Sequence, residues 1–110
     1  MILEKKQELD LGSNRIAEIE EDNLQGLISL THLYLFNNSI YQIDMGTFEA
    51  TPQLQELQLG KNLLIEVPLA LGRLFKLRYL DLSNNQIRTS SSTVVCFGTL
   101  KIIPEYIRYL

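Results

Sequence analysis

The chain repeats one pattern of aliphatic and polar positions about every 24 residues. The pattern is LxxLxLxxNxL, and its asparagines, Asn14, Asn38, Asn62 and Asn85, are spaced by 24, 24 and 23 residues. The three complete copies place aliphatic residues and asparagine at Leu30, Leu33, Leu35, Asn38, Ile40; Leu54, Leu57, Leu59, Asn62, Leu64; and Leu77, Leu80, Leu82, Asn85, Ile87. A first copy keeps Leu9 and Leu11 but has Lys6 in place of its leading leucine. A fixed period of this size is typical of a solenoid of stacked repeats.

The LxLx segment of each copy alternates apolar and polar residues, which predicts a short strand with one buried face. Leu33, Leu57 and Leu80, with the leucine two residues after each, should therefore point inward. Successive turns of a solenoid lie side by side, so the strands should form one parallel sheet on an inner, concave surface. The asparagine after each strand should be buried, with its amide bonded to loop backbone of its own and adjacent turns.

The second half of each copy returns the chain to the next strand through aliphatic anchors three to five residues apart. These anchors are Ile19, Leu24, Leu27; Ile43, Phe48; and Val67, Leu71, Leu74. Their spacing predicts short helical turns or irregular arcs on an outer, convex side. Pro68 is compatible with such an arc, because a segment without a ladder partner loses nothing by lacking an N–H.

This frame resembles the leucine-rich repeat family over residues 6–89. The resemblance implies an α/β fold: a horseshoe-shaped solenoid with a short parallel sheet on its concave side and short helices or irregular arcs outside. We expect an N-terminal edge at 1–5, repeats at 6–29, 30–53, 54–76 and from 77–89 onward, and a degenerate C-terminal cap or tail at 90–110. The second copy, with Phe48, looks like the repeat class common in extracellular and cell-surface receptors, although Thr51 replaces the leucine of that class.

Composition excludes several classes of function. Asp and Glu number 13 against 10 Lys and Arg, and the basic residues form no stripe, so we expect no nucleic-acid binding. The opening residues 1–8 are charged almost at once and do not read as a secretory signal, and the apolar stretch from Val94 is interrupted by Lys101 and Pro104, so no membrane span is expected. Cys96 is the only cysteine, which excludes an internal disulfide and the cysteine-paired caps of secreted members. The repeat class favours an extracellular or cell-surface location, but the lack of a signal peptide and of cysteine-paired caps does not support that location. We therefore expect a fragment of a longer protein or a short divergent member of the family.

The residues that alternate with the inward leucines along each strand should point to solvent and form the binding surface. The partner-binding residues predicted on the concave face are His32, Tyr34, Phe36, Glu56, Gln58, Tyr79 and Asp81. Exposed aromatic residues are frequent at the energetic centres of protein interfaces. The alternative is that these rings only shield the sheet or contact a neighbour outside this chain. Four strands present a face of roughly 300 Å², well below the roughly 800 Å² per partner of a standard interface, so loops, further repeats or a second copy would have to extend it.

No catalytic combination can be assigned, because His32 is the only histidine and nothing in the sequence pairs it with a nucleophile. We expect no catalytic residues, no cofactor and no metal. The predicted function is non-catalytic protein recognition of the receptor type, with a protein ligand of unknown identity. The alternatives are a substrate-selecting segment of an enzyme whose catalytic domain lies elsewhere, and a solenoid fragment with only a structural role. Self-association through the open ends of the sheet is a further expectation, because terminal strands present unpaired backbone groups.

Overall fold

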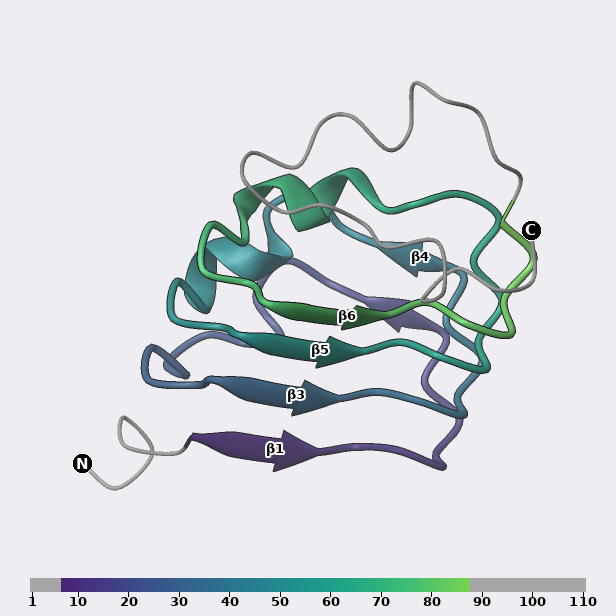
Figure 1. Ribbon diagram of the computed structural model, residues 1–110, viewed down its shortest axis with the longest axis horizontal. Coiled ribbons are helices and arrows are strands. Elements are labelled where there is room, and N and C mark those ends of the chain that lie inside the picture. The colour runs from purple at the N-terminus through teal and green to yellow at the C-terminus, as the bar shows by residue number, and fades with distance from the viewer. Residues whose placement is uncertain (1–6, 88–110) are drawn as a thin grey trace.

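A computed structural model describes residues 7–87 and confirms the predicted solenoid (Figure 1). The strands β1 (Glu8–Asp10), β3 (His32–Tyr34), β5 (Glu56–Gln58) and β6 (Tyr79–Asp81) form one parallel sheet in that order. Their register aligns Leu9, Leu33, Leu57 and Leu80 in one row. The register is the one that the 24-residue period predicts, with equivalent residues of successive repeats side by side.

The core lies directly behind this sheet. All ten leucines of the three complete frames are buried, with exposed fractions between 0% and 6%. The partly buried side chains Leu9, Leu11 and Ile16 of the first repeat pack against the same core. Because a shift of one residue would exchange the two faces of every strand, these burials fix which side chains the sheet displays to solvent.

The asparagines join each repeat to the one before it. The Asn62 side-chain amide donates to the carbonyl oxygens of Leu35, Leu59 and Gly60, and its oxygen accepts from the Ile40 N–H at 2.9 Å. Asn38 and Asn85 make the equivalent bonds. Asn62 and Asn85 are buried, as predicted. Asn14 instead is exposed, and within residues 7–87, which contain no earlier repeat, it bonds only to carbonyls of its own turn.

The outer side is irregular, as predicted, but it also contains a small sheet that the sequence did not indicate. Two 3₁₀ helices, η2 (Thr47–Ala50) and η3 (Leu69–Arg73), carry the anchors Phe48 and Leu71 into the core. The strands β2 (Glu18–Ile19) and β4 (Gln42–Ile43) pair in parallel on the outer side of the first two repeats. Short parallel pairing between outer arcs therefore supplements the inner sheet (Figure 1).

The outer pairing stops at β4, and Pro68 supplies a reason. In the first two repeats the Tyr41 N–H donates to the Ala17 carbonyl and the Asp44 N–H to the Ile19 carbonyl. The residue equivalent to Asp44 in the third repeat is Pro68, which has no N–H to offer to Ile43. Within residues 7–87, the third arc keeps only the bond from the Leu63 N–H to the Ile40 carbonyl before the two segments separate.

β1 and β6 are the terminal strands of the described sheet. Pairing of two chains through such edges stays a prediction. The predicted N-terminal edge at 1–5 and the predicted cap or tail at 90–110 lie outside the described residues.

Candidate functional site

The open face of the four-stranded sheet, here called the sheet face, displays two aligned rows of side chains. The first row is Glu8, His32, Glu56 and Tyr79, and the second is Asp10, Tyr34, Gln58 and Asp81. Six of the seven predicted site residues stand in these rows. The seventh, Phe36, follows two residues after Tyr34. The predicted residues therefore belong to one continuous surface.

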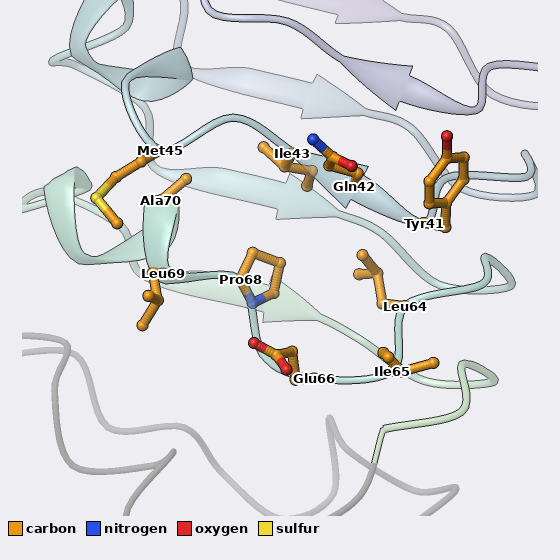
Figure 2. A pocket seen from close by; sticks show the side chains of 10 residues that line it. All are labelled: Tyr41, Gln42, Ile43, Met45, Leu64, Ile65, Glu66, Pro68, Leu69 and Ala70. Atoms are coloured by element: carbon orange, nitrogen blue, oxygen red, sulfur yellow. The ribbon is translucent and has the colours of Figure 1, made fainter.

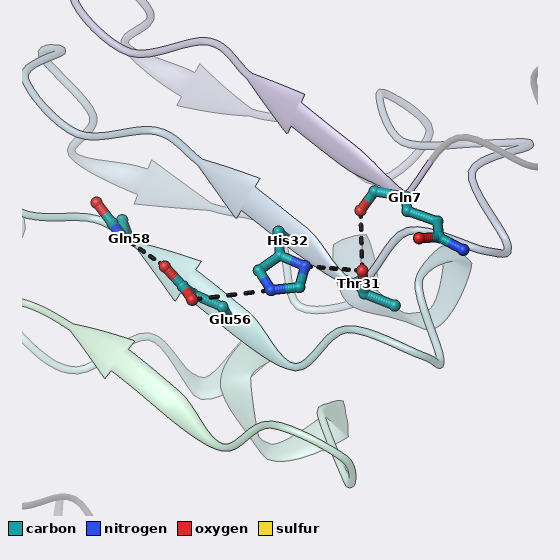
Figure 3. Close-up of polar contacts among 5 residues, drawn as sticks. All are labelled: Gln7, Thr31, His32, Glu56 and Gln58. Carbon is teal, nitrogen blue, oxygen red and sulfur yellow. Dashed lines mark hydrogen bonds and ion pairs between the residues drawn. The ribbon is translucent and has the colours of Figure 1, made fainter.

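A chain of polar contacts fixes His32 (Figure 3). The Thr31 hydroxyl donates to the Gln7 carbonyl at 3.1 Å, and the same hydroxyl oxygen lies 2.8 Å from His32 Nδ1. A hydroxyl has a single proton, so when that proton goes to Gln7 the hydrogen bond with His32 requires Nδ1 to be the donor. The opposite nitrogen, Nε2, lies 3.9 Å from the Glu56 carboxylate, beyond hydrogen-bond distance, and the two groups form an ion pair only when both ring nitrogens carry a proton.

Glu56 links the two rows. One carboxylate oxygen faces His32, and the other accepts a 2.7 Å hydrogen bond from the Gln58 side-chain amide. The side chains of His32 and Glu56 are 33% and 26% exposed, so both reach solvent while being held in place. The arrangement positions an acceptor carboxylate at the centre of the sheet face.

Tyr34 stands beside this group. Its ring centroid lies 6.4 Å from that of His32, with the planes tilted by 51°. Partial desolvation, and then the negative charges of Glu56, Glu8 and Asp10, raise the pKa of the Tyr34 phenol above its ordinary value. Tyr34 is therefore a neutral aromatic side chain, half-buried among carboxylates.

Phe36 leans toward the first repeat, over Gly12. A Cβ atom at position 12 would lie 2.6 Å from the Phe36 ring, so the glycine provides the space that the ring occupies. On the other side of Phe36, a hollow of about 210 Å³ opens at the exit of β5 and β6, with Gln58, Asp81 and Lys61 in its lining. The hollow brings together three predicted site residues, Phe36, Gln58 and Asp81.

The negative residues of the sheet face outnumber the positive ones. Its rows carry Glu8, Asp10, Glu56 and Asp81, and Lys61 lies beyond the end of β5. Two of these carboxylates also stabilise the local fold: Asp10 accepts from the Gly12 N–H, and Asp81 accepts from the N–H and hydroxyl of Ser83. Such Asx turns shape the chain where it leaves the strand.

The aromatic residues of this face are less open than the sequence suggested. His32, Tyr34, Phe36 and Tyr79 are all half-buried, because neighbouring rows of side chains cover their flanks. The large hydrophobic side chains that are more than 40% exposed lie at other positions: Ile28, Tyr41, Met45, Leu63, Ile65, Leu69 and Phe75. The sequence analysis did not predict this exposed group. A signal was present in the sequence, because Tyr41 and the equivalent residue of the next repeat, Ile65, are both large and hydrophobic.

The remaining chemistry of the described chain is limited. Residues 7–87 contain no group of three or more His, Cys, Asp or Glu side chains arranged to hold a metal ion. No helix within this range is long and apolar enough to cross a bilayer.

The fold and the asparagine rows define a repeat solenoid, and comparison with known proteins identifies its family. Leucine rich repeat models match residues 3–40, 28–87 and 76–110. The chain belongs to the leucine-rich repeat family.

The relatives are longer proteins. The chain is 38% identical over 82 residues to nephrocan of Mus musculus, covering 74% of this chain and 16% of the relative. It is 36% identical over 100 residues to leucine-rich repeat-containing G-protein coupled receptor 5 of Rattus norvegicus, covering 91% and 11%. Asporin of Bos taurus is 38% identical over 80 residues, covering 73% and 22%. The chain thus spans less than a quarter of the length of each of these relatives.

A solved structure supports the same fold. A chain of the Drosophila melanogaster SNF/U2A' complex is similar with a TM-score of 0.68 and 32% identity, over 84% of this chain and 53% of that chain.

Proposed function

We propose that the chain is a non-catalytic recognition module of the receptor type that binds a protein through its sheet face. The repeats predicted at residues 6–89 form the module. The observation that carries the proposal is the pair of aligned rows, in which Tyr34 and His32 stand among fixed carboxylates.

The side chains of the site are held before any partner arrives. His32 is bonded to Thr31, Glu56 to Gln58, and the Phe36 ring rests over Gly12. Positioned side chains lose little conformational freedom on binding, and this lowers the entropic cost of association. Tyr and His also combine an apolar ring with a polar end, which suits a partly hydrated interface.

The comparisons are consistent with this role. One relative is named as a G-protein coupled receptor, another, from Danio rerio, as a transforming growth factor beta activator, and the similar structure is part of a complex. The negative residues of the sheet face favour a partner with a basic or mixed surface, because complementary charge steers association.

The test is capture of partners by the immobilised chain, with three versions compared. Tyr34→Ala combined with His32→Ala should reduce capture at least roughly tenfold, the usual effect of losing residues at the centre of an interface. The control is Phe75→Ala, which removes a ring that is 72% exposed and lies outside both rows. Equal capture by all three versions would contradict the proposal, as would an equal loss with the control.

Stability must be measured beside capture. Both changes at the sheet face remove half-buried side chains, so the thermal midpoint should fall by only a few degrees. Capture that persists in full while the doubly substituted chain remains folded would favour the structural role that the sequence left open.

A further inference from the structure

A second surface of the molecule has features of a docking site. An open groove of about 300 Å³ lies on the outer side, between β4 and the arc of residues 64–70 (Figure 2). This volume is at the lower end of the range of about 300–1,000 Å³ that is common for ligand sites. The groove shares no lining residue with the rows of the sheet face.

The groove follows from the interruption of the outer pairing. Pro68 cannot continue the ladder that joins β2 to β4, and the third arc separates from β4 after Leu63. Leu64, Ile43 and Pro68 lie along the resulting gap (Figure 2). The Ile65 N–H has no acceptor among residues 7–87, whereas its equivalent, the Tyr41 N–H, donates to Ala17. Among the described residues, the groove therefore combines a main-chain donor without an acceptor and an apolar surface.

Four exposed apolar side chains frame the groove at equivalent positions of two repeats. Tyr41 and Ile65 stand at one end, 53% and 60% exposed, and Met45 and Leu69 at the other, 55% and 64% exposed (Figure 2). The first repeat has Ala17 and Glu21 at these positions. Grouped apolar side chains of this kind on a soluble protein mark sites of contact with another molecule.

The charged side chains around the groove are either acidic or paired with a residue of opposite charge. Glu66 is the one charged residue among those of residues 7–87 that line it. Glu18 accepts a hydrogen bond from the Tyr41 hydroxyl at one end, and Asp44 follows β4 directly and accepts from the Glu21 N–H. Arg73, in η3 beside the lining residue Leu69, lies 3.7 Å from Glu49 as an ion pair. A basic segment is the charge-complementary occupant.

We propose that this groove binds an extended segment of a partner protein that inserts one aromatic or large aliphatic side chain and carries basic residues on both sides of it. The inserted side chain contacts Ile65 and Leu69, and a flanking basic side chain pairs with Glu66. The Ile65 N–H donates to a carbonyl of the segment, as in strand addition at a sheet edge. This surface is independent of the sheet face, so either proposal can fail alone.

The experiment is a titration of the isotope-labelled full chain, followed by amide chemical shifts, with the synthetic peptide Lys-Thr-Lys-Phe-Lys-Thr-Lys. We expect the shifts to concentrate at residues 42–45 and 64–70. Replacing Phe in the peptide by Ala should weaken binding at least roughly tenfold, the effect of withdrawing one buried apolar side chain. Replacing every Lys in the peptide by Glu should also weaken it.

Variants of the chain make the assignment specific. Ile65→Ser with Leu69→Ser should weaken binding of the Phe peptide at least roughly tenfold, and Glu66→Gln should weaken it less and reduce its dependence on salt. The matched controls are Phe75→Ser, an exposed ring outside the groove lining, and Glu20→Gln, an exposed acid outside it. Neither control should change binding.

Several results would overturn the proposal. One is the absence of shifts at the groove with the Phe peptide, and another is equal binding by the groove variants and the controls. Shifts of the groove amides with protein concentration alone would make a second copy of the chain the occupant. A spin label on Cys96 that broadens the groove amides in the peptide-free chain would assign the groove to the chain's own C-terminal residues.

Discussion

The inner and outer sides of this solenoid are built under different constraints. The inner sheet runs through all four described repeats with an unbroken register, whereas pairing on the outer side joins only β2 to β4. On the inner side, the three complete repeats present leucines and an asparagine to their neighbours at the same positions. On the outer side, each arc follows its own residues, and Pro68 lacks the N–H that its equivalent Asp44 donates to Ile19. The inner side therefore sets the fold, and the outer side is free to vary.

The asparagine row gives the largest expected effect. Asn62→Ala removes four hydrogen bonds and leaves the buried Ile40 N–H without a partner among the described residues, whereas the Leu35 carbonyl still accepts from the Asn38 amide. We expect a loss of roughly 1–3 kcal/mol in the free energy of unfolding, measured by denaturant titration.

Asn14→Ala is the matched control for this loss. Asn14 is exposed and, among residues 7–87, bonds only to Leu11 and Gly12 of its own turn, so its replacement should cost well under half as much. Equal losses at the two positions would show that joining adjacent repeats is not what makes Asn62 important.

A buried hydroxyl on the outer side predicts a substitution that stabilises the chain. Thr47 is fully buried in η2, and its hydroxyl has no hydrogen-bond partner among the described residues. Thr47→Val removes that unsatisfied group and keeps the shape, so it should stabilise the chain by about 1 kcal/mol. Thr51→Val is the comparison, because the Thr51 hydroxyl donates to the Phe48 carbonyl, and it should bring no gain. Destabilisation by Thr47→Val would mean that the hydroxyl is satisfied after all.

The smallest expected effect is a change in the pH at which the Tyr34 phenol, on the inner side, ionises. Desolvation and the charges of Glu56, Glu8 and Asp10 raise the pKa of the Tyr34 phenol above 10.0. Because the pKa of Tyr34 is higher in the folded chain than in the unfolded chain, the protonated phenol contributes to the free energy of unfolding. That contribution is complete below about pH 10 and is lost as the pH rises through the pKa of the folded chain. Tyr41, whose pKa is raised by Glu18, also ionises late, so tyrosinate absorbance should show more than one late-ionising phenol. Tyr34→Phe should remove one of them, and Glu56→Gln should move that one toward lower pH. Ionisation of Tyr34 below pH 10 would contradict the described surroundings of the ring.

The sequence predicted the inner side almost residue by residue. A period of 24 with leucine and asparagine at fixed places leaves one way to stack the repeats, so the burial of Leu33, Leu57 and Leu80 and the bonds of Asn62 could be anticipated. The half-burial of Tyr34 and Phe36 could not, because it depends on neighbours such as Gly12, and a repeat frame does not say how far a ring leans.

The outer side was less predictable for a related reason. Its anchors could be read from aliphatic spacing, but the pairing of β2 with β4 depends on backbone geometry that no residue type specifies there. Pro68 was recognised as tolerable in an arc, yet its consequence for the adjacent strand requires knowing that Asp44 is its structural equivalent and bonds to Ile19.

Amide hydrogen exchange, resolved by residue, tests the contrast between the two sides most directly. The inner amides of Leu11, Leu35 and Leu59, bonded to Tyr34, Gln58 and Asp81 of the next repeat, should exchange slowly. On the outer side the Tyr41 amide should be protected and its equivalent at Ile65 should exchange fast. Protection of Ile65 equal to that of Tyr41 and Leu59 would show that the outer pairing continues past β4 and would contradict the account.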